Sequence, residues 1–263
     1  SIDYVKRFNN DFDMSFKGTF TYAHNKVLEY DEPDFQKYPN ISRVGHSVDQ
    51  QLLYIAERLF IDDSEVQRNP KQNLGGWVSG GDIKYKNLPD VNGNYDNVID
   101  SNDRQYTGMP TTPEIVYGFG PSFRYKKFDF SFFFQGAARV SIMMNGIHPF
   151  GAEGTRNVLQ FIADDYWSET NQNIYAEYPR LSKRDNENNT KASTYWQRNG
   201  AFLKLKNLEV GFNHKFFRVY LRGSNLLTFS PFKYWDPEMG SGSGLSYPTQ
   251  RVFNVGVQFS INK

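Results

Sequence analysis

The chain of 263 residues contains no cysteine, which excludes disulfides, thiolate metal sites and cysteine nucleophiles. It also lacks any run of about 20 apolar residues, the length that a membrane-spanning helix needs. Ser1 is not followed by the charged and apolar regions of a signal peptide. If the protein is exported, we expect its true N-terminus to lie upstream of Ser1.

The chain also has no excess of positive or negative charge. The 30 basic and 29 acidic residues leave a formal charge of +1, which gives no electrostatic reason to expect a nucleic-acid partner. Aromatic residues make up 17% of the chain, yet the mean hydropathy is -0.66. A sequence that is aromatic-rich and polar at once is typical of a β-barrel wall with a wet interior and long polar loops.

Strict alternation of apolar and polar side chains is the strongest pattern in the chain and predicts β-strands. It recurs in segments of about the length that crosses a bilayer as a tilted strand, roughly 9–11 residues. The predicted strands are Phe12–Tyr22, Glu114–Lys126, Phe128–Ile142, Ala201–Asn213, Phe216–Phe229 and the segment that begins near Phe253, with Ile2–Val5 as the tail of another strand.

Short and long connections alternate between these strands. Tight turns are predicted at Asn9-Asn10, Lys126-Lys127 and His214-Lys215, and long connections at 30–113, 143–198 and 230–250. Bacterial outer-membrane barrels have this layout, with short periplasmic turns and long extracellular loops. An antiparallel sheet packed on a soluble core also alternates, but such long loops are uncommon in compact soluble domains.

The pattern predicts an all-β fold, in which the chain supplies the C-terminal strands of a large antiparallel transmembrane barrel. Leu203 and Leu205 are out of phase with Leu208 and Val210, which predicts a β-bulge near Asn207. Seven strands cannot close such a barrel, so we expect the missing strands upstream of Ser1. Side chains expected to face lipid are Phe128, Phe130, Phe132, Phe134, Phe253, Val255, Val257 and Phe259; those expected in the lumen are Arg139, Arg218, Arg222, Asn254 and Gln258.

Several strings, in this order, resemble those of the SusC/RagA family of TonB-linked outer-membrane transporters. They cover nearly the whole chain: GDIKYK at 81–86, DVNG at 90–93, VIDSND at 98–103, PEIVYGFG at 113–120, FFQG at 133–136, YPRL at 178–181, WQRNGAFLKLKN at 196–207, NLLTF at 225–229 and WDPE at 235–238. Any one of them is weak, whereas the ordered set is specific.

The resemblance implies that residues 1–263 are the C-terminal portion of a TonB-dependent receptor barrel. The plug, the TonB-contacting segment and the upstream strands would then lie outside this chain. It further implies a location in the outer membrane of a Gram-negative bacterium of the Bacteroidetes type, within the lipid bilayer. The implied partners are the rest of the barrel, a SusD-like surface lipoprotein, TonB, and an oligosaccharide or oligopeptide substrate imported with the energy of the proton gradient.

One loop has the composition of a structural calcium site, the only cofactor that the sequence suggests. Its alternating oxygen ligands resemble an EF-hand loop, since Ca²⁺ prefers carboxylate and amide oxygens. The predicted ligands are Asp90, Asn92, Asp96, Asp100 and Asp103. The loop departs from the pattern, because Asn97 stands where Gly is usual and Asp103 where a bidentate Glu is usual. An Asp/Asn-rich turn without an ion is the alternative.

The remaining candidates are aromatic. Trp167, Trp196 and Trp235 are predicted to contact substrate or the lid lipoprotein, or to lie in an aromatic girdle at the membrane interface. Trp167 follows Asp164 and Asp165, but nothing in the sequence orients these carboxylates for acid–base chemistry, so no catalytic residue is expected. A soluble β-rich glycan-binding module is the alternative function, and a glycan-cleaving enzyme is a third.

Overall fold

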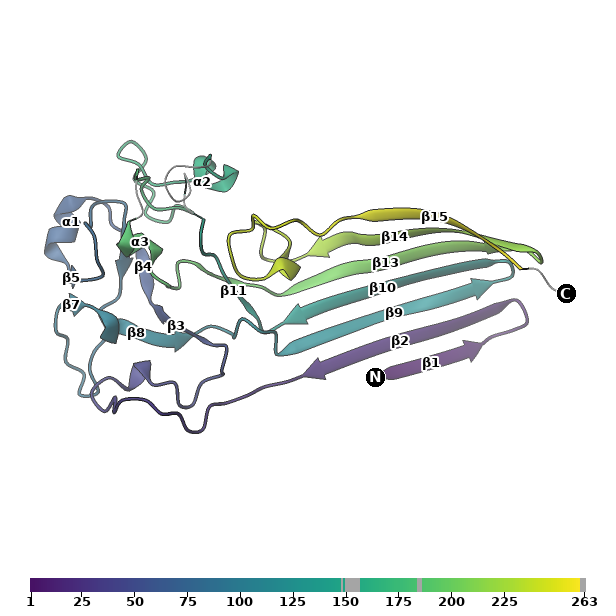
Figure 1. Ribbon diagram of the computed structural model, residues 1–263, viewed down its shortest axis with the longest axis horizontal. Coiled ribbons are helices and arrows are strands. Elements are labelled where there is room, and N and C mark those ends of the chain that lie inside the picture. Colours follow the sequence, from purple (N-terminus) through teal and green to yellow (C-terminus); the bar gives the residue numbers. More distant parts are fainter. Residues whose placement is uncertain (148, 150–156, 184–185, 261–263) are drawn as a thin grey trace.

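The computed structural model describes residues 1–147, 149, 157–183 and 186–260. Its main feature is a seven-stranded antiparallel sheet in the spatial order β1-β2-β9-β10-β13-β14-β15 (Figure 1). The strands are β1 (Ile2–Arg7), β2 (Phe12–Tyr22), β9 (Ile115–Tyr125), β10 (Phe128–Ala138), β13 (Phe202–Asn213), β14 (Phe217–Phe229) and β15 (Val252–Phe259). Each predicted strand is present. Within the described residues the sheet is open, with β1 and β15 at its edges.

The strand register divides the side chains into two faces, as the alternation predicts. On one side, here called the apolar face, Phe128 lies opposite Phe212 and Val257 opposite Val219. On the other side, the polar face, Asn254 lies opposite Arg222 and Gln258 opposite Arg218. The apolar face includes Phe12, Met14, Phe16, Phe20, Phe119, Phe123, Phe128, Phe130, Phe132, Phe134, Leu205, Leu208, Val210, Phe212, Val219, Leu221, Phe253, Val255, Val257 and Phe259.

The apolar face is largely uncovered. Phe253 and Val255 are each 74% exposed and Phe259 is 77% exposed. Among the described residues no second sheet packs on the Phe128 set, of which Phe128 is 57% and Phe130 38% exposed. Their predicted contact with lipid stays a prediction.

The predicted bulge is confirmed and is one of a pair. The register of β13 against β10 shifts by one residue beside Lys206. The register of β14 against β13 shifts at the same level, where Asn225 has a left-handed φ of 55°. The Lys206 Nζ donates a hydrogen bond of 3.2 Å to the Asn225 side-chain oxygen, which ties the two bulges together. Leu205 and Leu208 consequently both lie on the apolar face.

Strand β10 is shorter than predicted. It ends at Ala138, because Arg139 has a left-handed φ of 53° that breaks the extended backbone. The following residues form β11 (Ser141–Met143), which leaves the sheet and pairs with β12 (Gln197–Asn199). Arg139 therefore lies beyond the strand end, and strand alternation assigns it to neither face.

The three long connections fold together at one end of the sheet (Figure 1). We call this unit, which consists of the described residues within 23–114, 139–201 and 230–251, the cap. It contains small two-stranded sheets of β3 (Gln51–Tyr54) with β8 (Arg104–Thr107), β4 (Ala56–Leu59) with β6 (Ile83–Tyr85), β5 (Lys71–Gln72) with β7 (Val98–Ile99), and β11 with β12. Its helices are α1 (Asp63–Arg68), α2 (Gln160–Asp164) and α3 (Glu187–Thr190), with 3-10 turns η1 (Pro39–Ile41), η2 (Ser101–Asp103) and η4 (Pro237–Met239).

The principal hydrophobic core lies in the cap rather than in the sheet. All members of its central cluster of buried residues, among them Leu53, Ile83, Ile142 and Phe232, come from the three connections. The long connections are therefore not solvated loops but one packed unit. None of the helices in the described ranges is long and apolar enough to cross a membrane.

The bulge pair makes a testable prediction. Asn225→Val places a β-branched side chain at left-handed φ and removes the acceptor of Lys206, so we expect a loss of about 1–3 kcal/mol of stability. Asn225→Gly keeps the backbone conformation and removes only the side-chain contact, so its loss should be smaller. Unfolding of the full-length protein in denaturant measures both. Equal stability of the Val variant and wild type would contradict this role.

Candidate functional site

Two of the strings that resemble the SusC/RagA family, GDIKYK and YPRL, meet inside the cap. Gly81, from the GDIKYK string, has a left-handed φ of 81°, and a Cβ on it would lie 2.2 Å from the Trp167 ring. Its carbonyl accepts a 2.9 Å hydrogen bond from the backbone N–H of Arg180, in the YPRL string. Only glycine suits this position, because the indole of Trp167 occupies the space of a side chain.

The next residue carries a buried charge. Asp82 is fully buried, and the Arg180 guanidinium pairs with it through Nε at 2.8 Å and Nη2 at 3.1 Å. Its carboxylate also accepts hydrogen bonds from the Asn189 side chain and the Ser79 N–H, both at 2.8 Å. Burial raises the pKa of Asp82, although Arg180 acts in the opposite direction. The pair joins the first connection to the second.

Two buried amides extend this network. The Gln72 side chain donates to the Asn188 side chain at 2.7 Å and accepts from the Tyr85 N–H at 2.6 Å. The Tyr85 hydroxyl donates to the Asn188 carbonyl at 2.7 Å. Because these amides are satisfied on both sides, helix α3 is fixed against β5 and β6 without any ion.

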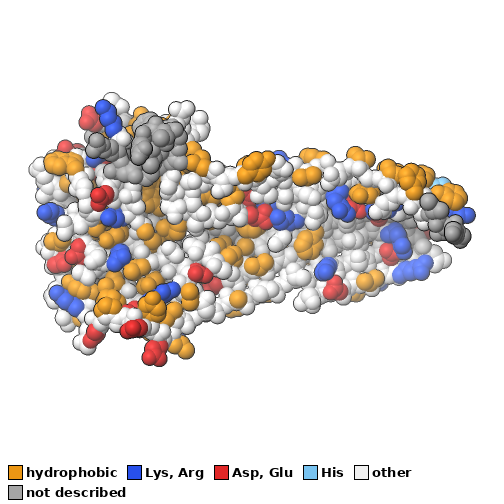
Figure 2. All heavy atoms as spheres, in the orientation of Figure 1, with side chains coloured by type: hydrophobic (Ala, Val, Ile, Leu, Met, Phe, Trp, Pro, Cys, Tyr) orange, Lys and Arg blue, Asp and Glu red, His pale blue; other side chains and the backbone are white. Residues whose placement is uncertain are grey.

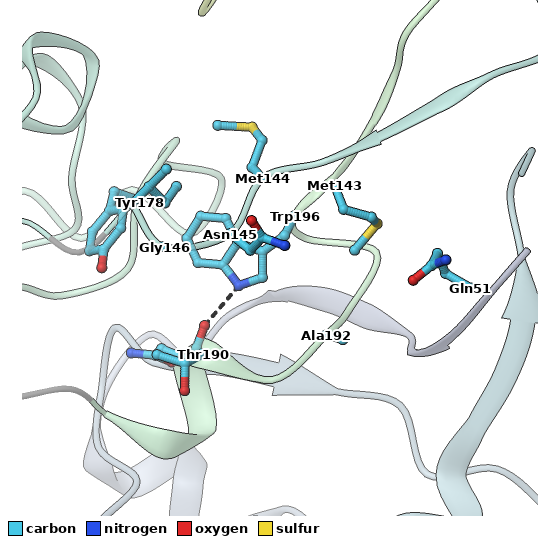
Figure 3. A pocket seen from close by; sticks show the side chains of 11 residues that line it. Gln51, Met143, Met144, Asn145, Gly146, Tyr178, Thr190, Ala192 and Trp196 are labelled. Carbon is cyan, nitrogen blue, oxygen red and sulfur yellow. Dashed lines mark hydrogen bonds between the residues drawn. The ribbon is translucent and has the colours of Figure 1, made fainter. Parts of the chain in front are cut away.

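The tryptophan predictions need correction. Trp167 and Trp196 are each 6% exposed and belong to the cap core, so neither ring is presented to a lid or a membrane interface in this structure. The Trp196 indole N–H donates to the Asn189 carbonyl at 2.8 Å (Figure 3). Trp235 packs against the same core edge-on to Phe232, with ring centroids 4.6 Å apart. Sequence alone could not distinguish buried from exposed loop tryptophans.

A pocket opens beside Trp196. It has a volume of about 150 Å³ and is lined by Trp196, Met143, Met144 and Tyr178, with Gln51, Asn145 and Thr190 among the polar groups (Figure 3). Methionine and aromatic walls with a few amides and a hydroxyl suit a small, mostly apolar group. No sequence pattern indicates this pocket, because its walls come from separate segments between Gln51 and Trp196.

The third connection is fixed to the polar face by two lysines. Lys204, 1% exposed, lies opposite Gln135 on the polar face and donates to Asp236 at 2.6 Å and to Glu238 at 2.5 Å. Lys206, at the bulge, pairs with Glu238 at 2.6 Å. Burial by itself would raise the pKa of Asp236, but the hydrogen bonds from Lys204 and the Glu238 N–H, together with the charge of Lys204, outweigh burial and lower the pKa. The WDPE string is thereby held over the polar face.

The predicted lumen arginines form a ladder of ion pairs along the polar face. Arg218 contacts Asp129 and Glu209, each at 2.6 Å, and Arg222 contacts Glu209 at 2.5 Å. Figure 2 shows acidic and basic side chains next to one another along the strands. Arg139, at the sheet end, pairs instead with the buried Glu114, which also contacts His24.

The predicted calcium ligands serve local turns. Asp103 accepts from the backbone N–H groups of Leu88 at 2.6 Å and Asp100 at 2.8 Å, and Asp100 caps η2. Asp90 accepts from the N–H groups of Asn92 and Asn94, and Asp96 from that of Val98. Among the described residues no group of three or more acidic, histidine or cysteine side chains is arranged to hold a metal. The calcium site stays a prediction, and backbone capping accounts for the same side chains.

Comparison with known proteins gives the class of the protein. TonB-dependent receptor P3 of Formosa agariphila is 27% identical over 278 aligned residues, covering 95% of this chain and 27% of the relative. TonB-dependent receptor P26 of the same organism is 28% identical over 269 residues, covering 89% and 26%. The chain thus spans about a quarter of the length of these relatives. No family model matches it.

The fold matches solved structures of the RagAB peptide importer. The open-open state superposes with a TM-score of 0.65 at 18% identity, and the closed-closed state with 0.66 at 19%. Each match covers 98% of this chain and 28% of the solved chain. The sequence relatives and the shared fold together show that the chain is part of a TonB-dependent receptor. Its fold is that of part of the RagAB importer, as the resemblance to the SusC/RagA family predicted. This class of protein is not an enzyme class.

The cap makes a prediction about pH through Glu65, at the start of α1. Burial by itself would raise the pKa of Glu65, but hydrogen bonds from Arg58, the Ile61 N–H and Lys84 outweigh it and lower the pKa from 4.5 to about 2. A lowered pKa stabilises the fold above the unfolded value, and this stability is lost as the pH falls from about 4.5 to 2. The shift corresponds to about 3 kcal/mol.

In Glu65→Gln we expect this stability to be missing at neutral pH and the loss between pH 4.5 and 2 to be smaller. Hydrogen exchange of residues 51–99 in the full-length protein reports opening of the cap. Glu57→Gln is the matched control, since Glu57 is more exposed and makes only a 3.4 Å contact with Lys84. Unchanged exchange in Glu65→Gln would show that α1 is held by packing alone.

Proposed function

We propose that residues 1–263 form the C-terminal part of the barrel of an outer-membrane importer. One observation supports this proposal: a single sheet has an exposed apolar face and, on its other side, a polar face whose charged side chains form ion pairs. In water, an apolar face of this extent is a site of aggregation unless something covers it. A bilayer covers it, and the soluble glycan-binding alternative offers no cover from the described residues.

The dimensions of the sheet support a transmembrane wall. Strands β9 and β10 have 11 residues each. At about 3.4 Å per residue and a tilt of roughly 35–45°, such a strand spans about 26–30 Å, close to the height of the apolar band of outer-membrane barrels. The short hairpins lie at one end and the cap at the other (Figure 1). We therefore assign the hairpins to the periplasmic side and the cap to the cell exterior.

The facing of the sheet follows from the third connection. Asp236 and Glu238 fold over the polar face and contact Lys204, whereas the apolar face is left bare. In a barrel, a loop that folds back onto the wall lies inside it. The polar face, with Arg218 and Arg222, is accordingly the lumen surface, and the apolar face contacts lipid.

The complete receptor would import an oligopeptide or oligosaccharide, with its plug and TonB-contacting segment outside this chain. The structural matches are to an importer of peptides solved as the RagAB complex, which supports a SusD-like lipoprotein as partner of the cap. Because the cap is one packed unit, it offers a rigid outer surface for such a partner.

Uptake by cells that carry the full-length protein tests the activity. Labelled oligopeptides and oligosaccharides of similar size are offered in parallel, and uptake is compared with a deletion strain. We expect one class to accumulate in a manner that requires both the protein and the proton gradient, so an uncoupler should abolish it. Uptake that survives the uncoupler, or that is equal in the deletion strain, would refute an energy-coupled importer.

The facing assignment is tested by a matched pair of neighbours in β15. Val255→Arg places a charge on the apolar face in mid-strand and should cost about 2–4 kcal/mol, which reduces the amount of folded protein in outer-membrane fractions. Asn254→Arg places the same charge on the polar face and should be tolerated. If Asn254→Arg lowered the amount of folded protein and Val255→Arg did not, the assignment of the two faces would be reversed. If both variants were tolerated equally, a membrane-spanning sheet would be contradicted.

A further inference from the structure

The hairpins at the end of the sheet opposite the cap form a continuous edge. The Lys126 N–H donates to the Asp11 carbonyl and the Asn213 N–H to the Lys127 carbonyl, both at 2.6 Å. The Ser260 N–H donates to the Phe216 carbonyl at 3.0 Å. Each hairpin is thus bonded to its neighbour, so their turn residues lie side by side at one level.

Aromatic side chains line this edge on the apolar face. Phe12 lies opposite Tyr125, Tyr125 opposite Phe128, and Phe128 opposite Phe212, which makes one cross-strand row. Phe128 is 57% exposed and Tyr125 is 55% exposed. Aromatic rows at this depth are where a bilayer changes from hydrocarbon to headgroups.

Each hairpin adds a lysine whose ammonium group lies over an exposed aromatic ring. The Nζ atoms are 4.8 Å from the Phe8 centroid for Lys6, 5.5 Å from Tyr125 for Lys126, and 5.3 Å from Phe216 for Lys215. This is the arrangement of a cation–π contact, in which the face of the ring attracts the ammonium group. The cations are therefore held along the edge rather than spread through the solvent.

Within the described part of the chain, no carboxylate neutralises the charges of these lysines. Among the described residues Lys6, Lys126, Lys127 and Lys215 form no ion pair, whereas the nearby carboxylates of Asp13 and Asp129 pair with arginines on the polar face. The turns Phe8–Asp11, Lys126–Lys127 and His214–Phe216 contain a single acidic residue, Asp11. The edge presents unpaired ammonium groups beside an aromatic row.

We propose that this lysine edge binds the phosphate groups of anionic phospholipids in the leaflet at the hairpin end of the sheet. The inference rests on the proposed function, because it places the aromatic row in a membrane interface. The three hydrogen-bonded hairpins each place a lysine ammonium group over an aromatic ring. Several lipid headgroups can therefore bind along this end of the sheet. The ligand is a lipid rather than transported substrate, since the edge lies on the apolar side and far from the cap.

The test uses full-length protein reconstituted in vesicles of phosphatidylcholine with a minor fraction of phosphatidylglycerol. Spin-labelled lipids of each type report the lipids in contact with the protein. We expect the wild type to be enriched in phosphatidylglycerol at low salt. Lys126→Gln, Lys127→Gln and Lys215→Gln should each lower the enrichment by up to about fivefold. About 1 M salt should abolish it.

Two variants separate charge at this edge from charge in general. Lys37→Gln removes an exposed lysine that lies over Tyr38 in the cap, 5.1 Å from its ring, and should leave the enrichment unchanged. The triple Lys→Arg variant at 126, 127 and 215 keeps the charge and should keep the enrichment. Competition by inorganic phosphate at constant ionic strength would indicate a site for free phosphate instead of lipid.

The inference is overturned if inserted wild-type protein shows no preference for phosphatidylglycerol. It is equally overturned if the three Lys→Gln variants keep the preference, or if Lys37→Gln loses it to the same degree. Failure of the protein to insert into vesicles at all is a different result, because it would refute the membrane-spanning sheet itself.

Discussion

The whole structure depends on one constraint, the division of apolar and polar side chains between two faces that is kept across seven strands. A slip of one residue in any strand would turn its apolar side chains to the polar face. The two bulges at Lys206 and Asn225 show how strict this constraint is: each shifts the register by one residue at the same level, and the Lys206–Asn225 hydrogen bond joins them. Leu205 and Leu208 therefore share a face despite an odd separation, and the apolar face stays continuous.

That continuity separates the two environments on which the proposed function depends. The sheet contributes little to the hydrophobic core, which lies in the cap, and it leaves Phe253, Val255 and Phe259 bare. On the opposite face, carboxylates and guanidinium groups form ion pairs across the strands, as Asp129 does with Arg218. Because opposite charges are paired, this face can line a narrow aqueous interior. A barrel wall with an apolar outer face and a hydrated, charge-balanced inner face is suited to a solute pathway through a membrane.

The cap converts three separate connections into one body. The buried Asp82–Arg180 pair and the amides of Gln72 and Asn188 bind the first connection to the second, while Lys204 binds the third to the sheet. Removing one partner of a buried pair leaves an uncompensated charge, which typically costs 3–5 kcal/mol.

The sequence by itself determined the strands, the tight turns, the bulge near Asn207 and the face of each strand residue, because alternation is local and repeats along the chain. It also identified the SusC/RagA resemblance from strings such as GDIKYK and YPRL. Only the tertiary structure decided what those strings do: Gly81, Arg180 and Trp196 meet from distant segments to build the cap core. For the same reason sequence reasoning placed Trp167 and Trp196 at a surface, and it extended β10 to Ile142. The burial of these tryptophans and the break in the extended backbone at Arg139 depend on contacts between segments far apart in the chain. Such contacts leave no periodic pattern in the sequence.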